Sequence, residues 1–316
     1  MSASSTISLF RHRPFQLYVG GRAFAGFASQ MVSVIVAWQL YELTNSAFLL
    51  GMIGLVQFIP TALLIFIAGH VADTYDRKRV VQLCQFGAAF GAAFLAWGSI
   101  GGWLTVPEMF AVVLVFGTST AFSSPASAAL MTGISPGGML QRVTAIASGT
   151  FEVATICGPA LGGFVYGISP GVGYIAIAAL WSVGALLMGA IPLERPVTSG
   201  RPAPTPGAIF AGWTFVRRNP VILGAISLDL FTVLLGGAST LLPIYARDIL
   251  HTDATGMGLL RAAPAVGALI MTAVLSRYAI QRKTGMRLFQ AIIVYGIATL
   301  VFGVSHLMWL SLLALA

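Results

Sequence analysis

Long apolar runs alternate with short polar connections along the whole chain. A helix needs about 20 residues to cross the hydrocarbon core of a bilayer. Runs of about that length cover residues 15–41, 48–68, 80–100, 107–132, 141–167, 172–191, 221–245, 256–275 and 288–305. A further run begins at Leu307 and reaches Ala316, where the sequence stops. Ten helical residues span only about 15 Å, roughly half a bilayer. The pattern therefore predicts an all-α polytopic membrane protein with nine spans and the start of a tenth.

The composition supports a membrane protein over a soluble one. Charged residues make up 8% of the chain, hydrophobic residues 57%, and the mean hydropathy is +0.90. Soluble domains carry about a quarter charged residues. Cys84 and Cys157 each lie inside an apolar run, which favours small core residues over a disulfide. The polar leader before the first run is followed by too long an apolar segment for a secretory signal, so we expect that segment to be a retained helix.

The net charge of +8 comes from short clusters of cations between the apolar runs. These clusters have no interleaved aromatic residues, so we expect no nucleic-acid partner. With the N-terminus in the cytoplasm, 14 of the 17 Lys and Arg residues fall on the cytoplasmic side. They are Arg11, Arg13, Arg77, Lys78, Arg79, Arg142, Arg195, Arg201, Arg217, Arg218, Arg277, Arg282, Lys283 and Arg287. The positive-inside rule therefore predicts a cytoplasmic N-terminus.

One long connection separates the sixth and seventh runs. Residues 193–219 are rich in Pro, Gly and Arg, a composition typical of a linker. Within it, residues 207–218 carry Phe210, Trp213 and Phe215, which predict a short amphipathic helix at the membrane interface.

A weak internal repeat supports two halves. Gly54 and Pro60 in the second span have the same spacing as Gly258 and Pro264 in the eighth. Parallel repeats of this kind occur in transporters. We therefore expect an N-terminal six-helix bundle at 1–192, a cytoplasmic linker at 193–219, and an incomplete C-terminal bundle of three helices plus the start of a fourth at 220–316.

Charge is concentrated in "GHVADTYDRKR", residues 69–79, directly after the second span. This stretch resembles the signature loop of the major facilitator superfamily. The positions that match are Gly69, Ala72, Asp73, Arg77 and Lys78, whereas Val71, Thr74 and Asp76 depart from the usual pattern. The resemblance implies a conformational gate, in which the aspartate holds the positive end of a helix from the opposite half and the cations bind carboxylates. In the family that helix belongs to the eleventh span, which we expect to lie beyond a C-terminal truncation of this chain. The alternative is that the cations only set membrane orientation.

The sequence "GPALGG" in the fifth span is similar to the core of the family's antiporter motif. Its residues are Gly158, Pro159, Gly162 and Gly163, while Ala154 stands where the family has an upstream glycine. The resemblance implies a role in export and in limiting leak. The alternative is ordinary close packing of helices through small residues, with a proline bend.

Two further stretches, "LLRAAPAVGAL" and "FRHRPFQLYVGGRAF", resemble the efflux branch that includes enterobactin exporters. The resemblance implies a secondary active transporter in the bacterial inner membrane, in which protons drive export of a small amphipathic molecule, a drug or a siderophore, by alternating access. Its partners would be that substrate, protons and lipid. No metal, nucleotide or catalytic motif occurs, so we expect no cofactor and no enzyme. The alternative is a non-transporting scaffold or fragment of such a transporter. The sequence indicates no oligomeric state.

Four ionisable residues fall within predicted spans: Arg22, Glu152, Asp229 and Arg261. Such residues are costly in a membrane and usually face a cavity or a partner. Glu152 and Asp229 lie roughly 16 and 14 Å into their spans, near the midplane. We therefore predict a proton or substrate site there, with Arg22 either neutralising Glu152 or binding an anionic substrate. The alternatives are a static pair of charges that joins helices and an Arg22 side chain that extends to the interface.

Overall fold

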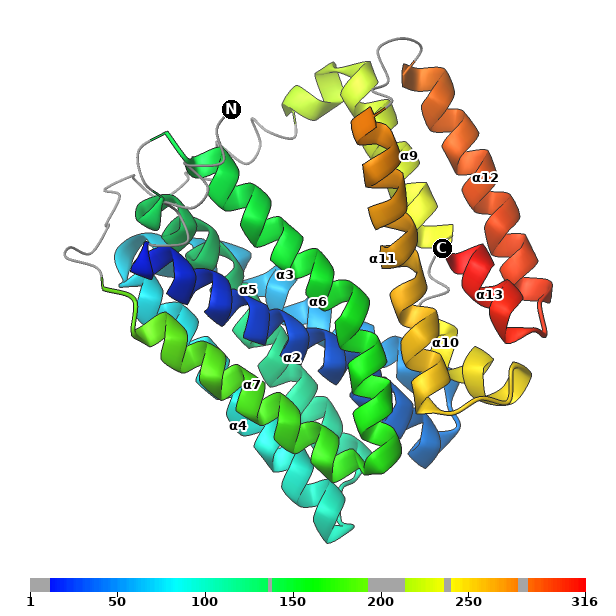
Figure 1. Ribbon diagram of the computed structural model, residues 1–316, viewed down its shortest axis with the longest axis horizontal. Coiled ribbons are helices and arrows are strands. Elements are labelled where there is room, and N and C mark those ends of the chain that lie inside the picture. The colour runs from blue at the N-terminus through cyan, green and yellow to red at the C-terminus, as the bar shows by residue number, and fades with distance from the viewer. Residues whose placement is uncertain (1–11, 136–137, 193–213, 236–239, 278–283) are drawn as a thin grey trace.

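The computed structural model describes residues 12–135, 138–192, 214–235, 240–277 and 284–316, and every regular element in these residues is helical. The first group of helices is α2 (Arg13–Thr44), α3 (Ala47–Thr74), α4 (Arg77–Gly101), α5 (Val106–Ile134), α6 (Leu140–Ile168) and α7 (Pro170–Gly189). They pack side by side as one bundle (Figure 1). The prediction of an all-α protein is confirmed.

Polar residues between the apolar runs start and stop these helices. Ser46 accepts a hydrogen bond of 3.4 Å from the Leu49 amide and so caps α3. Thr105 and Glu108 form a capping box at the start of α5. Gly102 ends α4 with a φ of 70°, a backbone conformation that favours glycine. The short connections reverse the direction of the chain, but apart from α4 and α5 the main packing partners are not consecutive: α4 packs on α7, and α3 packs on α5.

Helix α2 lies at the centre of the bundle. Its second half is almost entirely buried, and it packs against α6 on one side and α7 on another. Close approach to α7 depends on small residues, since a methyl group on Gly21 would lie 3.1 Å from the Gly184 carbonyl oxygen. By contrast, α3 leaves most of its length exposed. The core therefore surrounds α2.

A second group of helices lies to one side of this bundle (Figure 1). It consists of α9 (Pro220–Leu235), α10 (Leu242–Ile244), the π-helix η2 (Tyr245–Ile249), α11 (Ala254–Arg277), α12 (Thr284–Val304) and α13 (Met308–Leu315). Tyr245 ties η2 to the end of α12, because its hydroxyl contacts the carbonyls of Phe302 and Ser305.

The seventh predicted span, 221–245, contains residues 236–239, which lie outside the described residues. Before them the structure describes α9, and after them helical turns from 240 that lead into α10 and η2. The continuity of this span stays a prediction.

In the described part of the chain, eight helices are long and apolar enough to cross a membrane: α2 to α7, α11 and α12. The protein is therefore an all-α polytopic membrane protein. The linker at 193–219 lies largely outside the described residues, as does most of the predicted amphipathic helix, of which 214–218 are helical. The division into domains stays a prediction.

Candidate functional site

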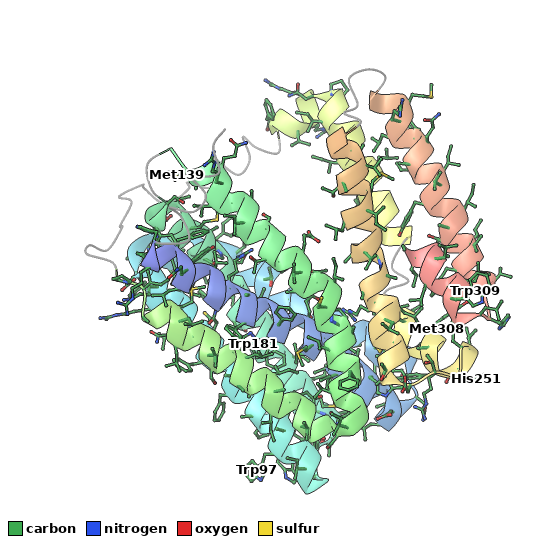
Figure 2. All side chains as sticks on the ribbon, viewed as in Figure 1. Trp97, Met139, Trp181, His251, Met308 and Trp309 are labelled. Carbon is green, nitrogen blue, oxygen red and sulfur yellow. The ribbon has the colours of Figure 1, made fainter. Side chains whose placement is uncertain are left out.

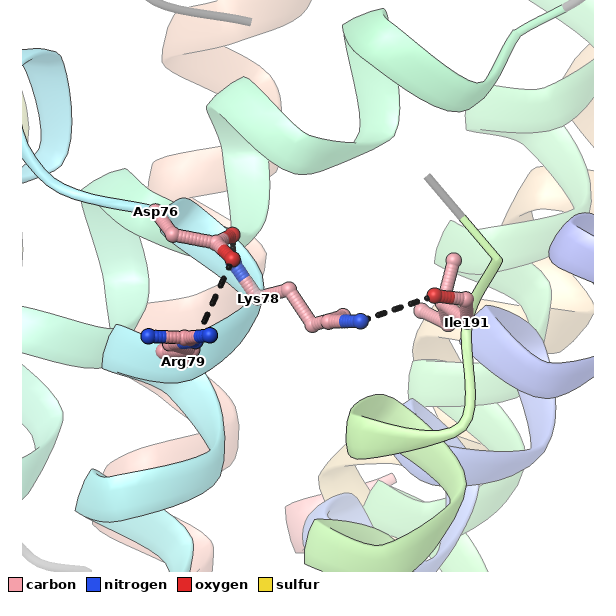
Figure 3. A network of polar contacts seen from close by, with 4 residues as sticks. All are labelled: Asp76, Lys78, Arg79 and Ile191. Carbon is pink, nitrogen blue, oxygen red and sulfur yellow. Dashed lines mark hydrogen bonds and ion pairs between the residues drawn. The ribbon is translucent and has the colours of Figure 1, made fainter. Parts of the chain in front are cut away.

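The charged stretch 69–79 is less a loop than a tight corner between two helices. Helix α3 continues to Thr74 and α4 begins at Arg77, so only Tyr75 and Asp76 connect them. The Asp76 carboxylate accepts a hydrogen bond of 3.1 Å from the Lys78 amide and caps α4. It also lies 3.7 Å from the Arg79 guanidinium (Figure 3). Capping by Asp76 explains why the corner is shorter than the sequence suggested.

Two cations of this corner bind backbone carbonyls at helix ends. Arg77 is buried; its Nε donates to the Ala72 oxygen at 3.2 Å and its Nη1 to the Ala129 oxygen at 3.3 Å. Lys78 Nζ donates to the Ile191 oxygen at 3.1 Å, just past the end of α7 (Figure 3). These bonds join α3, α5 and α7 to the start of α4, beyond any role of the cations in orientation.

Gly69 and Asp73, the other two predicted gate residues, are half-buried near the end of α3. A methyl group built on Gly69 would meet no described atom within 4 Å. Close helix approach at Gly69 therefore does not occur among the described residues, and the gate role of the four residues stays a prediction.

The Gly158–Gly163 segment packs α6 tightly against α2. A methyl group on Gly158 would lie 2.6 Å from Gln30 Cβ, and one on Gly162 would lie 3.0 Å from Met31 Cα. The distance at Gly158 is shorter than real Cβ contacts, and the distance at Gly162 is tighter than nearly all of them. The small residues are therefore required for this contact.

The same segment also joins α6 to α11. A methyl group on Gly163 would overlap the carbonyl of Ala254, where α11 begins. One on Gly258 would overlap the carbonyl of Pro159. The predicted motif thus lies where α2, α6 and α11 meet.

The four ionisable residues predicted within spans lie on α2, α6, α9 and α11. Glu152 is exposed on α6. Within the described part of the chain, no carboxylate lies within ion-pair distance of Arg22, so the pairing of Arg22 with Glu152 that the sequence left open is absent. Asp229 falls on α9, with its side chain outside the description. Arg261 lies on α11 and reaches a small cavity against α2, α3 and α5. No single cluster of the four is formed among the described side chains.

Arg22 lines a larger cavity inside the α2–α7 bundle, with a volume of about 400 Å³. Its walls carry a row of hydroxyl side chains from α5, two glutamines and three aromatic side chains. These are Gln57, Gln85, Phe116, Ser119, Thr120, Ser123, Ser124, Ser127, Phe151 and Trp181. Figure 2 shows Trp181 within this bundle. The sequence signal for this polar wall is "GTSTAFSSPAS" within the fourth apolar run. The mean hydropathy of the run does not reveal these hydroxyl residues.

At the carboxyl end of α2, a polar junction connects α2, α6 and η2. Trp38 Nε1 donates to a Glu42 carboxylate oxygen at 2.8 Å, and the Tyr166 hydroxyl of α6 donates to the other oxygen. We call this end of the bundle, together with the contacts to η2, the α2 carboxyl-end junction.

The junction continues from α2 to η2. The Tyr41 hydroxyl donates to the Asp248 carboxylate, and the Arg247 guanidinium lies 5.6 Å from the centroid of the Tyr41 ring. Arg247 Nη1 also donates to Asn45 Oδ1 at 3.1 Å. Sequence reasoning missed these contacts, because aromatic and polar residues at helix ends are typical of any membrane interface. Only folding brings residues so far apart in the chain together.

Comparison with known proteins agrees with this architecture. A family model described as Major Facilitator Superfamily matches residues 19–316. The chain therefore belongs to the major facilitator superfamily of membrane transporters, as the motifs at Asp73 and Pro159 indicated.

Among curated relatives, the multidrug efflux pump Tap of Mycobacterium tuberculosis is 26% identical over 290 residues, covering 87% of this chain and 68% of Tap. The enterobactin exporter EntS of Citrobacter koseri is 24% identical over 328 residues, covering 98% of this chain and 74% of EntS. The predicted similarity to efflux proteins is confirmed at this low identity.

Solved structures show the same fold. A bacterial homolog of the human lysosomal transporter Spinster, in an inward-facing and unoccupied conformation, aligns with a TM-score of 0.71 at 15% identity, covering 96% of this chain and 72% of that one. The nucleoside transporter NupG aligns with a TM-score of 0.69 at 14% identity, covering 96% and 78%.

Proposed function

We propose that this transporter is a proton-coupled exporter of a small amphipathic molecule, a drug or a siderophore, and that it has no enzymatic activity. We place it in the bacterial inner membrane with its N-terminus in the cytoplasm. The names of Tap and EntS support export of such compounds. The cations clustered at the amino ends of α2 and α4 support this orientation.

The observation that carries the proposal is the pairing of α6 with α11 at one end only. They contact through Pro159, Gly163, Ala254 and Gly258, and they diverge toward the other end (Figure 1). From Val266 onward, the described residues of α11 are almost all exposed. With the proposed orientation, the contact closes the outer side. Alternating access then requires this junction to break while contacts form on the cytoplasmic side.

Coupling to protons needs a carboxyl group that changes its protonation during this cycle. We propose Glu152, which is exposed on α6 on the amino side of the α6–α11 contact, and Asp229 on α9. Both positions lie in apolar helices, where an ionisable residue is costly unless it has a function.

A vesicle assay tests the coupling. Inverted vesicles with an imposed pH gradient are given a panel of fluorescent amphipathic compounds, with a protonophore as control. We expect gradient-dependent accumulation, and a loss of about tenfold or more in Glu152→Gln or Asp229→Asn, in line with the typical contribution of a positioned proton-transfer group. Downhill exchange in the absence of the gradient should persist in the same variants. Unchanged gradient-driven transport in both variants would contradict the proposal.

A further inference from the structure

The cavity inside the α2–α7 bundle combines an incompletely bonded cation with an incompletely bonded acceptor. Among the described residues, Arg22 Nε is buried without a hydrogen-bond partner, while its Nη1 has a long bond of 3.4 Å to Ser127 Oγ. Gln85 is 7% exposed, and its Oε1 likewise has no partner in the described part of the chain. Buried polar groups are normally satisfied. The Arg22 nitrogen needs an occupant that accepts a hydrogen bond, whereas the Gln85 oxygen needs a donor, which an anionic group cannot supply. The proposal below therefore rests on Arg22.

The charge of this site is positive. Among the described residues that line the cavity, Arg22 is the only charged one, and no carboxylate is present. The guanidinium lies 5.8 Å from the Phe151 ring centroid, which stabilises the cation without neutralising it. An occupant that carries negative charge would supply the anionic partner that the described lining of the cavity does not offer to Arg22.

The walls away from Arg22 are partly apolar and partly hydroxylated. Phe116 and Trp181 form a pair with ring centroids 5.1 Å apart, and both line the cavity. The hydroxylated part of the wall includes Ser123 and Thr120, whose hydroxyl groups donate to backbone carbonyls at 3.5 and 2.9 Å. Such a wall suits an occupant with a flat apolar part and a polar end.

We propose that this cavity binds the anionic head of an amphipathic organic molecule, such as a carboxylate, sulfonate or phosphate, with Arg22 as the anion-binding residue. Its flat apolar part lies against Phe116 and Trp181. The inference deepens the proposed function, on which it rests, by naming the charge class of the substrate. Of the alternatives that the sequence left open for Arg22, the proposal takes the anionic ligand.

Equilibrium binding to the detergent-solubilised protein tests this inference without any proton gradient. The probes are naphthalenesulfonate and naphthalenesulfonamide, which have similar shapes and differ in charge. We expect the sulfonate to bind about tenfold more tightly, because its hydrogen bonds to a guanidinium are charge-assisted. Arg22→Gln should abolish this preference, and Arg22→Lys should retain part of it. Arg79→Gln, which removes one exposed cation at the corner of α3 and α4, should leave the preference unchanged.

The rate of alkylation of Cys84 tests whether the sulfonate binds in this cavity. It lines the cavity, whereas Cys157 lies outside it and serves as an internal control in the same sample. Bound sulfonate should slow alkylation of Cys84 and leave Cys157 unaffected. Equal affinity for the two probes, a preference that survives in Arg22→Gln, or alkylation of Cys84 at the same rate with and without sulfonate would each overturn the inference. Loss of proton coupling in the vesicle assay leaves all three measurements intact, so the two proposals fail separately.

Discussion

Arg77 shows how one residue serves two purposes. Its position in the signature stretch marks the family, and its charge fits the proposed orientation. In the structure it is also buried and donates to carbonyls of both α3 and α5. The side chain of neighbouring Arg79 is 79% exposed. Two cations only two positions apart therefore contribute very differently to stability.

Arg77→Gln should lower the thermal stability of the detergent-solubilised protein. It removes hydrogen bonds from a charged donor to two carbonyls, each worth about 1.5–3 kcal/mol, so we expect a loss of about 3–6 kcal/mol. Arg79→Gln removes the same charge from an exposed pair, where the contribution is about 0–1 kcal/mol. Equal loss in both variants would show that Arg77 acts through its charge alone.

At the scale of the element, the glycines of α6 are packed tightly at one end of the helix and exposed at the other. Toward its carboxyl end, Gly158, Gly162 and Gly163 lie against backbone or Cβ atoms of α2 and α11. Toward its amino end, Gly149 is exposed and faces open space among the described residues. The same residue type is thus required for packing in one turn and is merely tolerated in another.

Gly163→Ala and Gly149→Ala should therefore change stability in opposite directions. The methyl group at 163 would overlap the Ala254 carbonyl and overpack the α6–α11 contact, at a cost of about 1–3 kcal/mol. The methyl group at 149 meets no neighbour, and alanine in an exposed helix position gains about 0.5–1 kcal/mol over glycine. Thermal unfolding of the two variants measures both signs. A stabilising Gly163→Ala would show that α6 and α11 are not in this contact.

At the scale of the whole molecule, the α2 carboxyl-end junction holds helices from distant parts of the chain together. Tyr41 and Arg247 connect α2 to η2, and Tyr166 connects α6 to α2. A π-helix often occurs at functional positions, and η2 lies directly between α10 and the turn into α11. The alternating access that we propose requires this junction to open in every cycle.

Tyr41→Phe should loosen the junction, since it deletes a hydrogen bond to the Asp248 carboxylate. A loss of about 1–2 kcal/mol raises local opening roughly 5- to 30-fold. Hydrogen exchange of the segment 245–256, followed by mass spectrometry, measures this opening. Tyr75→Phe, at an exposed tyrosine at the other end of the bundle, is the matched control. In an Asp248→Asn background, Tyr41→Phe should have a smaller effect, and an undiminished effect would rule out the bond.

The helical architecture could be read almost entirely from the sequence. Apolar runs of sufficient length leave no alternative to helices in a bilayer, because backbone polar groups find no partners in lipid. What hydropathy did not predict is the π-helix η2 at Tyr245–Ile249, where the run 221–245 ends. Hydropathy measures the preference of side chains for lipid, and it does not measure which kind of helix the backbone forms.

The sequence by itself determined the class of this protein, its family and the residues of its motifs, because these depend on composition and on local spacing. Only the tertiary structure decided what each motif touches. It placed the Gly158–Gly163 segment against α2 and α11, separated Arg22 from Glu152, and assembled the junction of Tyr41 with Asp248. Contacts of this kind join residues far apart in the chain, and their geometry follows from how helices pack and not from any local pattern.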